Sequence, residues 1–157
     1  MMAAMCLALS SIELFTRSSR LVGGPPWLRL HQSVIVRSVG EGASPRPVCF
    51  DFLPVDPTAP QTAGALLLGR AVPGVVRRVE LAPTSLLDGD AVLRGTTRRS
   101  MAELERWASD FPPELALFGA GRNHCRDFVA RFLEFASGTR EDRSRRERVA
   151  GTETSRV

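Results

Sequence analysis

Residues 121–138 read GRNHCRDFVARFLEFASG, a stretch that combines a helical pattern with a cysteine beside a histidine. After Cys125, apolar residues recur three, four, seven, eight and eleven positions along, at Phe128, Val129, Phe132, Leu133 and Ala136. This spacing predicts an amphipathic helix with one buried face, and Cys125 begins that face. Asn123 is the predicted N-cap, and Gly138 is the predicted end of the helix.

A cysteine in the first turn of a helix has a chemical consequence. The unpaired backbone N–H groups and the helix dipole favour the thiolate and can also donate to an oxyanion. A base is needed as well, but the adjacent His124 diverges from Cys125 by roughly 100° on a helix. His31, near the start of a predicted strand, is therefore the better partner. The alternative is that Cys125 is a small core residue with an unreactive thiol.

The segments outside this helix predict a mixed fold. The sequence SMAELERWASDF (100–111) predicts a second helix, with Ser100 and Glu103 forming a capping box and Pro112 ending it. Strands are predicted at 27–37, 48–53 and within 72–81, the first two pairing as a hairpin, whereas 63–69 fits a short helix or a turn. The expected class is α+β, a small antiparallel sheet flanked by helices.

The length of the chain and the changes in composition along it predict one domain with two flanking segments. A chain of 157 residues with 43% hydrophobic residues can bury a core of its own. Residues 1–24 are expected to be a leader or N-terminal helix, and their Ser and Arg residues leave a targeting role open. Residues 25–138 form the predicted domain. Residues 139–157 are charged and nearly free of apolar side chains, which predicts disorder.

Composition argues against several classes of function. The net charge is +4, but all 21 basic residues are scattered arginines, so we expect no nucleic-acid partner. Three cysteines without a CxxC pair argue against a disulfide framework and favour a reducing, intracellular setting, cytoplasm or plastid. No apolar run is long enough for an integral membrane segment. No cofactor motif occurs, and the spacing of His31, His124, Cys49 and Cys125 matches no zinc pattern.

Two separated motifs resemble one family group. The segments LHQSVIV (30–36) and NHCRDFVARFLEF (123–135) resemble the circularly permuted papain-like group. This group contains the lecithin:retinol acyltransferase-like proteins, the PPPDE peptidases and uncharacterised plant proteins, the last of which the connecting segments resemble most. In this group a histidine opens an early strand, and the cysteine comes later, at a helix start. The resemblance covers roughly residues 27–138, although His124 and not an asparagine directly precedes Cys125.

The resemblance implies a permuted papain-like fold and a site for acyl transfer. Cys125 would be the nucleophile and His31 the base, with Asp51 the charged candidate for a third residue and Asn123 a weaker one. The Cys125 backbone N–H and a side chain, Gln32 or Asn123, would hold the oxyanion, and His124 would lie beside the substrate.

The expected reaction is hydrolysis or acyl transfer on an ester, amide or isopeptide, with a small-molecule, lipid or peptide acyl substrate and no cofactor. The sequence does not indicate an oligomeric state. A different class of function stays open: a non-catalytic interaction or lipid-binding domain that retains the fold.

Overall fold

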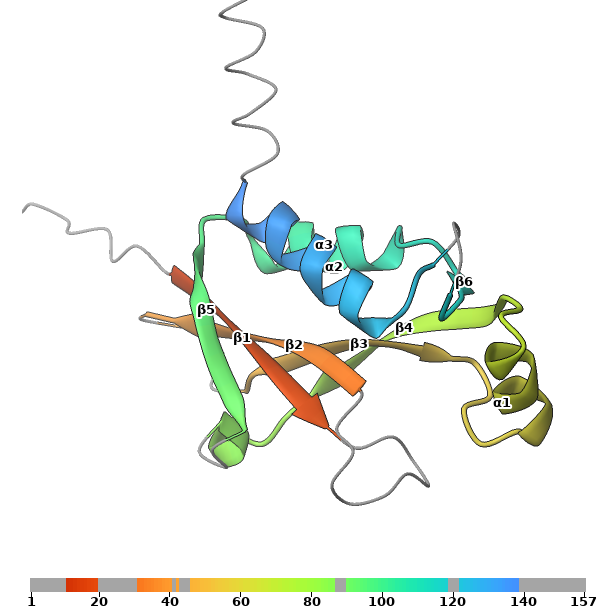
Figure 1. Ribbon diagram of the computed structural model, residues 1–157. Coiled ribbons are helices and arrows are strands. Elements are labelled where there is room, and N and C mark those ends of the chain that lie inside the picture. The colour runs from red at the N-terminus through yellow and green to blue at the C-terminus, as the bar shows by residue number, and fades with distance from the viewer. Residues whose placement is uncertain are drawn as a thin grey trace, which may run out of the picture.

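The computed structural model describes residues 11–19, 31–40, 42, 46–86, 90–118 and 122–138 (Figure 1). Its elements in chain order are β1 (Ser11–Ser19), β2 (His31–Val39), β3 (Val48–Pro54), α1 (Pro60–Leu67), β4 (Val72–Glu80), the 3-10 helix η1 (Pro83–Leu86), β5 (Ala91–Thr97), α2 (Met101–Ser109), β6 (Glu114–Leu115) and α3 (Cys125–Ser137). The expectations for residues 1–10, 20–30 and 139–157, including the predicted disorder of the C-terminal segment, lie outside the described residues.

The strands form one sheet in the order β5-β1-β2-β3-β4-β6, with every neighbouring pair antiparallel. The predicted hairpin is present, since Ser33 pairs with Asp51 and Val36 pairs with Val48. The predicted third strand is β4, which pairs with β3 and places Arg77 opposite Asp51. The α+β class and the antiparallel sheet are therefore as predicted.

The N-terminal expectation was wrong for residues 11–19. These residues form β1, a central strand that pairs with both β2 and β5. The physical reason is a period of two: Ile12 and Leu14 are buried in the core, while Glu13 is only partly buried and pairs with Arg37. The packed domain therefore includes residue 11 and does not begin at residue 25.

Helices α2 and α3 cover one face of the sheet, whereas α1 lies at the far ends of β3 and β4 (Figure 1). Phe128 and Phe132 of α3 are fully buried, as is Leu104 of α2, against Phe50 and Phe52 of β3. The Phe128 ring meets the rings of Phe52, Trp107, Phe111 and Phe132. This aromatic cluster fixes the position of α3, and with it that of Cys125.

Both ends of α3 are held by hydrogen bonds, and the start differs from the prediction. His124, not Asn123, is the N-cap, because its Nδ1 accepts from the Arg126 N–H at 3.2 Å while Asp127 Oδ2 accepts from the His124 N–H at 3.2 Å. Asn123 instead forms a β-bridge with Ala116. Gly138 ends α3 in the left-handed conformation, as predicted.

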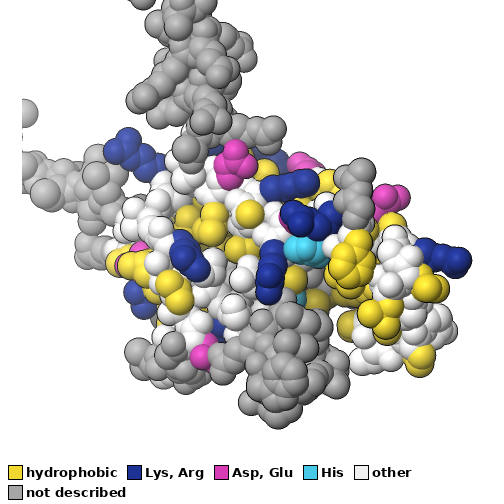
Figure 2. Space-filling view, in the orientation of Figure 1, with side chains coloured by type: hydrophobic (Ala, Val, Ile, Leu, Met, Phe, Trp, Pro, Cys, Tyr) yellow, Lys and Arg dark blue, Asp and Glu magenta, His cyan; other side chains and the backbone are white. Residues whose placement is uncertain are grey.

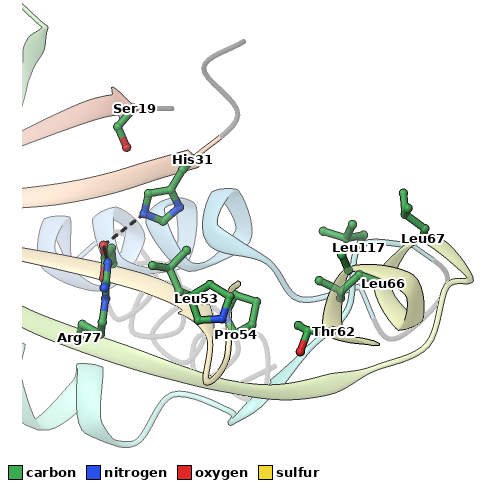
Figure 3. Close-up of a pocket in the computed structure, with 12 residues that line it drawn as sticks. Ser19, His31, Leu53, Pro54, Thr62, Leu66, Leu67, Arg77 and Leu117 are labelled. Atoms are coloured by element: carbon green, nitrogen blue, oxygen red, sulfur yellow. Dashed lines mark hydrogen bonds and ion pairs between the residues drawn. The ribbon is translucent and has the colours of Figure 1, made fainter. Parts of the chain in front are cut away.

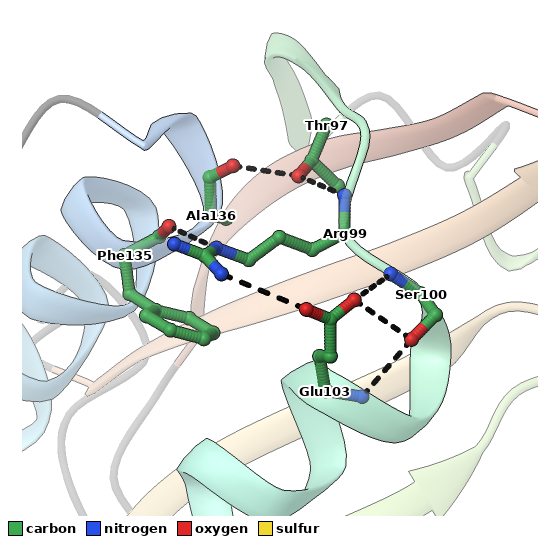
Figure 4. A network of polar contacts seen from close by, with 6 residues as sticks. All are labelled: Thr97, Arg99, Ser100, Glu103, Phe135 and Ala136. Atoms are coloured by element: carbon green, nitrogen blue, oxygen red, sulfur yellow. Dashed lines mark hydrogen bonds and ion pairs between the residues drawn. The ribbon is translucent and has the colours of Figure 1, made fainter. Parts of the chain in front are cut away.

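A polar network joins the C-terminal turn of α3 to β5 and the start of α2 (Figure 4). The Thr97 hydroxyl donates to the Ala136 carbonyl at 2.6 Å, and Arg99 Nε donates to the Phe135 carbonyl at 2.7 Å. At the start of α2, the predicted capping box of Ser100 and Glu103 is present. The network satisfies carbonyls that the end of a helix leaves without partners, so it anchors α3 on the sheet.

Candidate active site

His31 is the first residue of β2 and is almost fully buried, with 6% of its surface exposed. Its Nε2 lies 3.2 Å from Asp51 Oδ2 of the neighbouring strand. The sheet register explains this contact: Asp51 is directly opposite Ser33, two residues from His31, so both side chains project from the same face. The sequence-predicted base and third residue are thus brought together.

Asp51 is held on its other side by Arg77, its register partner on β4. Arg77 Nε donates to Oδ1 at 3.0 Å and Nη2 donates to Oδ2 at 2.7 Å, a two-pronged contact typical of arginine and carboxylate. Burial favours the neutral acid, but the hydrogen bonds from His31 and Arg77 outweigh it, so the pKa of Asp51 is lowered. Asp51 is therefore an ionised carboxylate aimed at the His31 ring.

Cys125 is the first residue of α3, and its thiol interacts with the His31 ring. Burial favours the neutral thiol, but the hydrogen bond with His31 and the backbone N–H groups of Gln32 and Arg126 favour the thiolate. The net effect is a lowered pKa for Cys125.

The buried Cys49 differs from Cys125. Burial raises its pKa, and the bond with Ser33 only partly opposes this. Of these two cysteines, Cys125 alone is therefore activated.

The His31 ring is correspondingly stabilised as a cation. Burial opposes the charge, but the hydrogen bonds to Asp51 and Cys125, together with their negative charges, raise the pKa of His31 to about 9. Nε2 faces Asp51, and the buried Nδ1 has no hydrogen-bond partner among the described residues. This arrangement favours an imidazolium–thiolate pair at neutral pH.

The remaining predicted site residues have other surroundings. The Asn123 amide donates to the Glu114 carbonyl at 2.7 Å, so the structure places Asp51, not Asn123, beside His31. Gln32 was expected to donate to the oxyanion through its side chain. In the structure its backbone N–H donates to the Cys125 sulfur. His124 caps α3 and contacts Asp127.

A pocket of about 410 Å³, here called the α1 pocket, opens beside His31 (Figure 3). Its polar end is formed by Ser19, His31, Asp51 and Arg77. Its apolar end lies between the end of β3 and helix α1, at Leu53, Pro54, Leu66, Leu67 and Leu117. Figure 3 shows Arg77 on one side of His31 and the α1 leucines on the other. The candidate proton-transfer group therefore lies at the wall of a cavity of ligand size.

Sequence reasoning missed Arg77 and the α1 pocket. Arg77 is one of two adjacent arginines, and only the β3–β4 register shows that it, and not Arg78, faces Asp51. Arg78 instead contacts Glu105 and Glu80. The run of apolar residues at 65–68 was a signal for α1, but apolar composition alone does not separate a pocket wall from core.

Comparisons of the chain with protein-family models, with curated proteins and with solved structures found no match. Among the described residues, no helix is long and apolar enough to cross a membrane. In the same part of the chain, no three His, Cys, Asp or Glu side chains are grouped so that they could hold a metal ion. The geometry of the site itself is therefore the basis on which a function can be proposed.

Proposed function

We propose that this protein is a cysteine-dependent acyl-transfer enzyme of permuted papain-like type, with Cys125 as nucleophile and His31 as acid and base. The observation that carries the proposal is the buried arrangement in which Asp51 holds the ring of His31 and His31 lowers the pKa of Cys125. The order along the chain, histidine on an early strand and cysteine at a later helix start, is the order that the family resemblance implies.

The chemistry follows from the protonation states. The Cys125 thiolate attacks the carbonyl carbon of an ester or amide, and the carbonyl π electrons move to oxygen to give an oxyanion. The backbone N–H groups of Gln32 and Arg126, which favour the thiolate, are the donors that we expect to stabilise that oxyanion.

Collapse of this intermediate forms the thioester and expels an alcohol or amine, which takes the proton of His31. His31 is then neutral and removes a proton from water, or from another acceptor, as the acceptor attacks the thioester. This second step restores the thiolate and the protonated ring. Asp51 and Arg77 change neither charge nor bonding in the cycle; they keep the His31 ring oriented and favour its protonated form.

The first experiment is iodoacetamide alkylation of each cysteine as a function of pH, measured by mass spectrometry. In the native chain, Cys125 is expected to alkylate with an apparent pKa well below the ordinary value near 8.5, and Cys49 only above that value. In His31→Gln, the apparent pKa of Cys125 should return to an ordinary or higher value.

A matched control is His124→Gln, which alters the other histidine but not the His31–Asp51 contact. It should leave the apparent pKa of Cys125 closer to the native value than His31→Gln does. If Cys125 reacts only after unfolding, the proposal is overturned in favour of a non-catalytic interaction or lipid-binding domain.

A further inference from the structure

Helix α1 is apolar yet buries none of its residues. The sequence PQTAGALL contains no charged side chain, and no residue of this helix is buried. Leu67 is 76% exposed, and Leu68, directly after the helix, is 73% exposed. Figure 2 shows hydrophobic side chains gathered over this end of the molecule. Ala65 and Leu66 are half-buried against the core, whereas the exposed side chains of Leu67 and Leu68 are available for another contact.

The α1 pocket joins this unused apolar surface to the reacting groups. Leu66 and Leu67 line it from α1, Leu53 and Pro54 from β3, and Leu117 from the segment before α3. The His31 ring lines the same pocket and also interacts with the Cys125 thiol. Cys125 itself does not line the pocket, so the His31 ring is the group that connects the pocket with the thiol.

The polar end of the pocket carries little net charge. Arg77 and Asp51 neutralise each other through two hydrogen bonds, and the protonated His31 is balanced by the Cys125 thiolate. No charged side chain belongs to the α1 side of the wall. A substrate group that extends from His31 toward α1 therefore binds more tightly if it is apolar and more weakly if it is charged.

We infer that the α1 pocket binds the acyl chain of the substrate and that this chain is uncharged, aliphatic and of medium length. This inference rests on the proposed function, since it places the scissile carbonyl at Cys125. A cavity of about 410 Å³ lies within the range of small-molecule sites and is large enough for an acyl chain of medium length. Medium-chain acyl esters are therefore the substrates that this pocket would fit.

The test is a series of p-nitrophenyl esters, from acetate through butyrate and hexanoate to decanoate, with kcat/KM measured for each. We expect kcat/KM to rise by about two- to fourfold per added methylene, the gain from burying that group, and then to level off. An ester with an ω-carboxylate on a hexanoyl chain should react more slowly than its neutral counterpart. Equal rates for acetate and decanoate would overturn the inference.

Variants on α1 separate the pocket from general surface apolarity. Leu67→Ser removes a pocket-lining side chain and should lower kcat/KM for decanoate by about three- to tenfold, a larger loss than for acetate, whose acyl group does not reach α1. Leu68→Ser, at a residue of similar exposure that does not line the pocket, is the control and should change neither. Ala63→Phe narrows the pocket at an exposed position and should shift the preferred chain to a shorter one.

A binding measurement distinguishes failure of this inference from failure of the proposed function. The N-methylamides of butanoic, hexanoic and octanoic acid, in which the acyl chain is the part that varies, are titrated calorimetrically into Cys125→Ala, which cannot react. Affinity that rises with chain length and falls in the added Leu67→Ser variant supports the pocket even if the native chain has no esterase activity. If the protein hydrolyses the esters but neither kcat/KM nor the affinity for the amides depends on the length of the acyl chain, the proposed function stands and the α1 pocket is rejected as the acyl site. The inference would also be rejected if the protein self-associates through Leu67 and Leu68 and binds none of the amides.

Discussion

Helices α3 and α1 are both rich in apolar residues, but the molecule uses them in opposite ways. In α3 the apolar residues recur at helical spacing, and Phe128, Val129, Phe132 and Ala136 are buried under the sheet. In α1 they follow one another at 65–68 around a short helix, and none is buried. Apolar composition thus becomes core only where the spacing directs it to one face. We expect the stability of the fold to depend on α3 and selectivity for a ligand to depend on α1.

The largest expected effect tests this division directly. Phe128→Ala removes a fully buried ring that contacts four other aromatic rings, and it should lower the free energy of unfolding by about 3–5 kcal/mol. Leu67→Ala removes an exposed side chain and should change it by no more than about 0.5 kcal/mol. Urea unfolding followed by Trp fluorescence measures both. Similar losses in the two variants would mean that α1 belongs to the core after all.

The same contrast explains how much of the fold could be predicted from sequence. Helices α2 and α3 were predicted because capping residues and a regular apolar stripe are local signals. Strand β1 was missed because the apolar run that precedes residue 11 resembles a leader, which hid the alternation of Ile12 and Leu14. The N-cap was placed one residue early, since a histidine is an uncommon cap and Asn123 a common one.

The candidate site was predictable only as far as residue chemistry reaches. Cys125 and His31 were singled out by a helix start, a strand start and a family resemblance, and Asp51 by its charge on the next strand. The role of Arg77 depends on which β4 residue lies opposite Asp51, and a shift of one residue would have placed Arg78 there. The α1 pocket depends on how α1 sits relative to β3 and Leu117, which no local pattern encodes.

A smaller effect is expected for Asp51→Asn, a change on β3 that acts on the cysteine at the start of α3. This substitution should reduce the reactivity of Cys125 without disturbing the core. Asp51 stabilises the protonated His31 ring, so its loss lets burial lower the pKa of His31 from about 9 toward or below its ordinary 6.5. A neutral ring no longer favours the thiolate, so the pKa of Cys125 rises. Alkylation of Cys125 at neutral pH should slow by about tenfold, the change for one pKa unit.

The pH profile of esterase activity provides a second measure of the same variant. The native profile should fall on the alkaline side near pH 9, where His31 loses the proton it donates to the leaving group. In Asp51→Asn this limb should move to lower pH. Asp110→Asn, at the exposed C-cap of α2, is the matched control and should leave the alkaline limb in place. An unmoved alkaline limb in Asp51→Asn would show that Asp51 does not act on His31.

The smallest effect concerns Arg77, which lines the α1 pocket and binds Asp51, the partner of His31. Its contact with Asp51 is two-pronged but half exposed, so Arg77→Met should lower the free energy of unfolding at neutral pH by only about 1 kcal/mol. The sign of the pH dependence is fixed by Asp51. Its pKa is lowered in the folded protein, so the stabilisation is present above the unfolded value of about 3.9 and is lost as the pH falls through the folded value.

The difference in stability between the native chain and Arg77→Met should therefore shrink in acid, because a protonated Asp51 no longer pairs with the guanidinium. Arg78→Met is a close control: it lies next on the same strand, keeps an aliphatic stem of similar length and loses only exposed contacts with Glu105 and Glu80. Urea unfolding at neutral pH and at about pH 3, below the ordinary pKa of a carboxyl, measures both variants. A deficit of Arg77→Met that persists in acid would show that it does not come from the ion pair with Asp51.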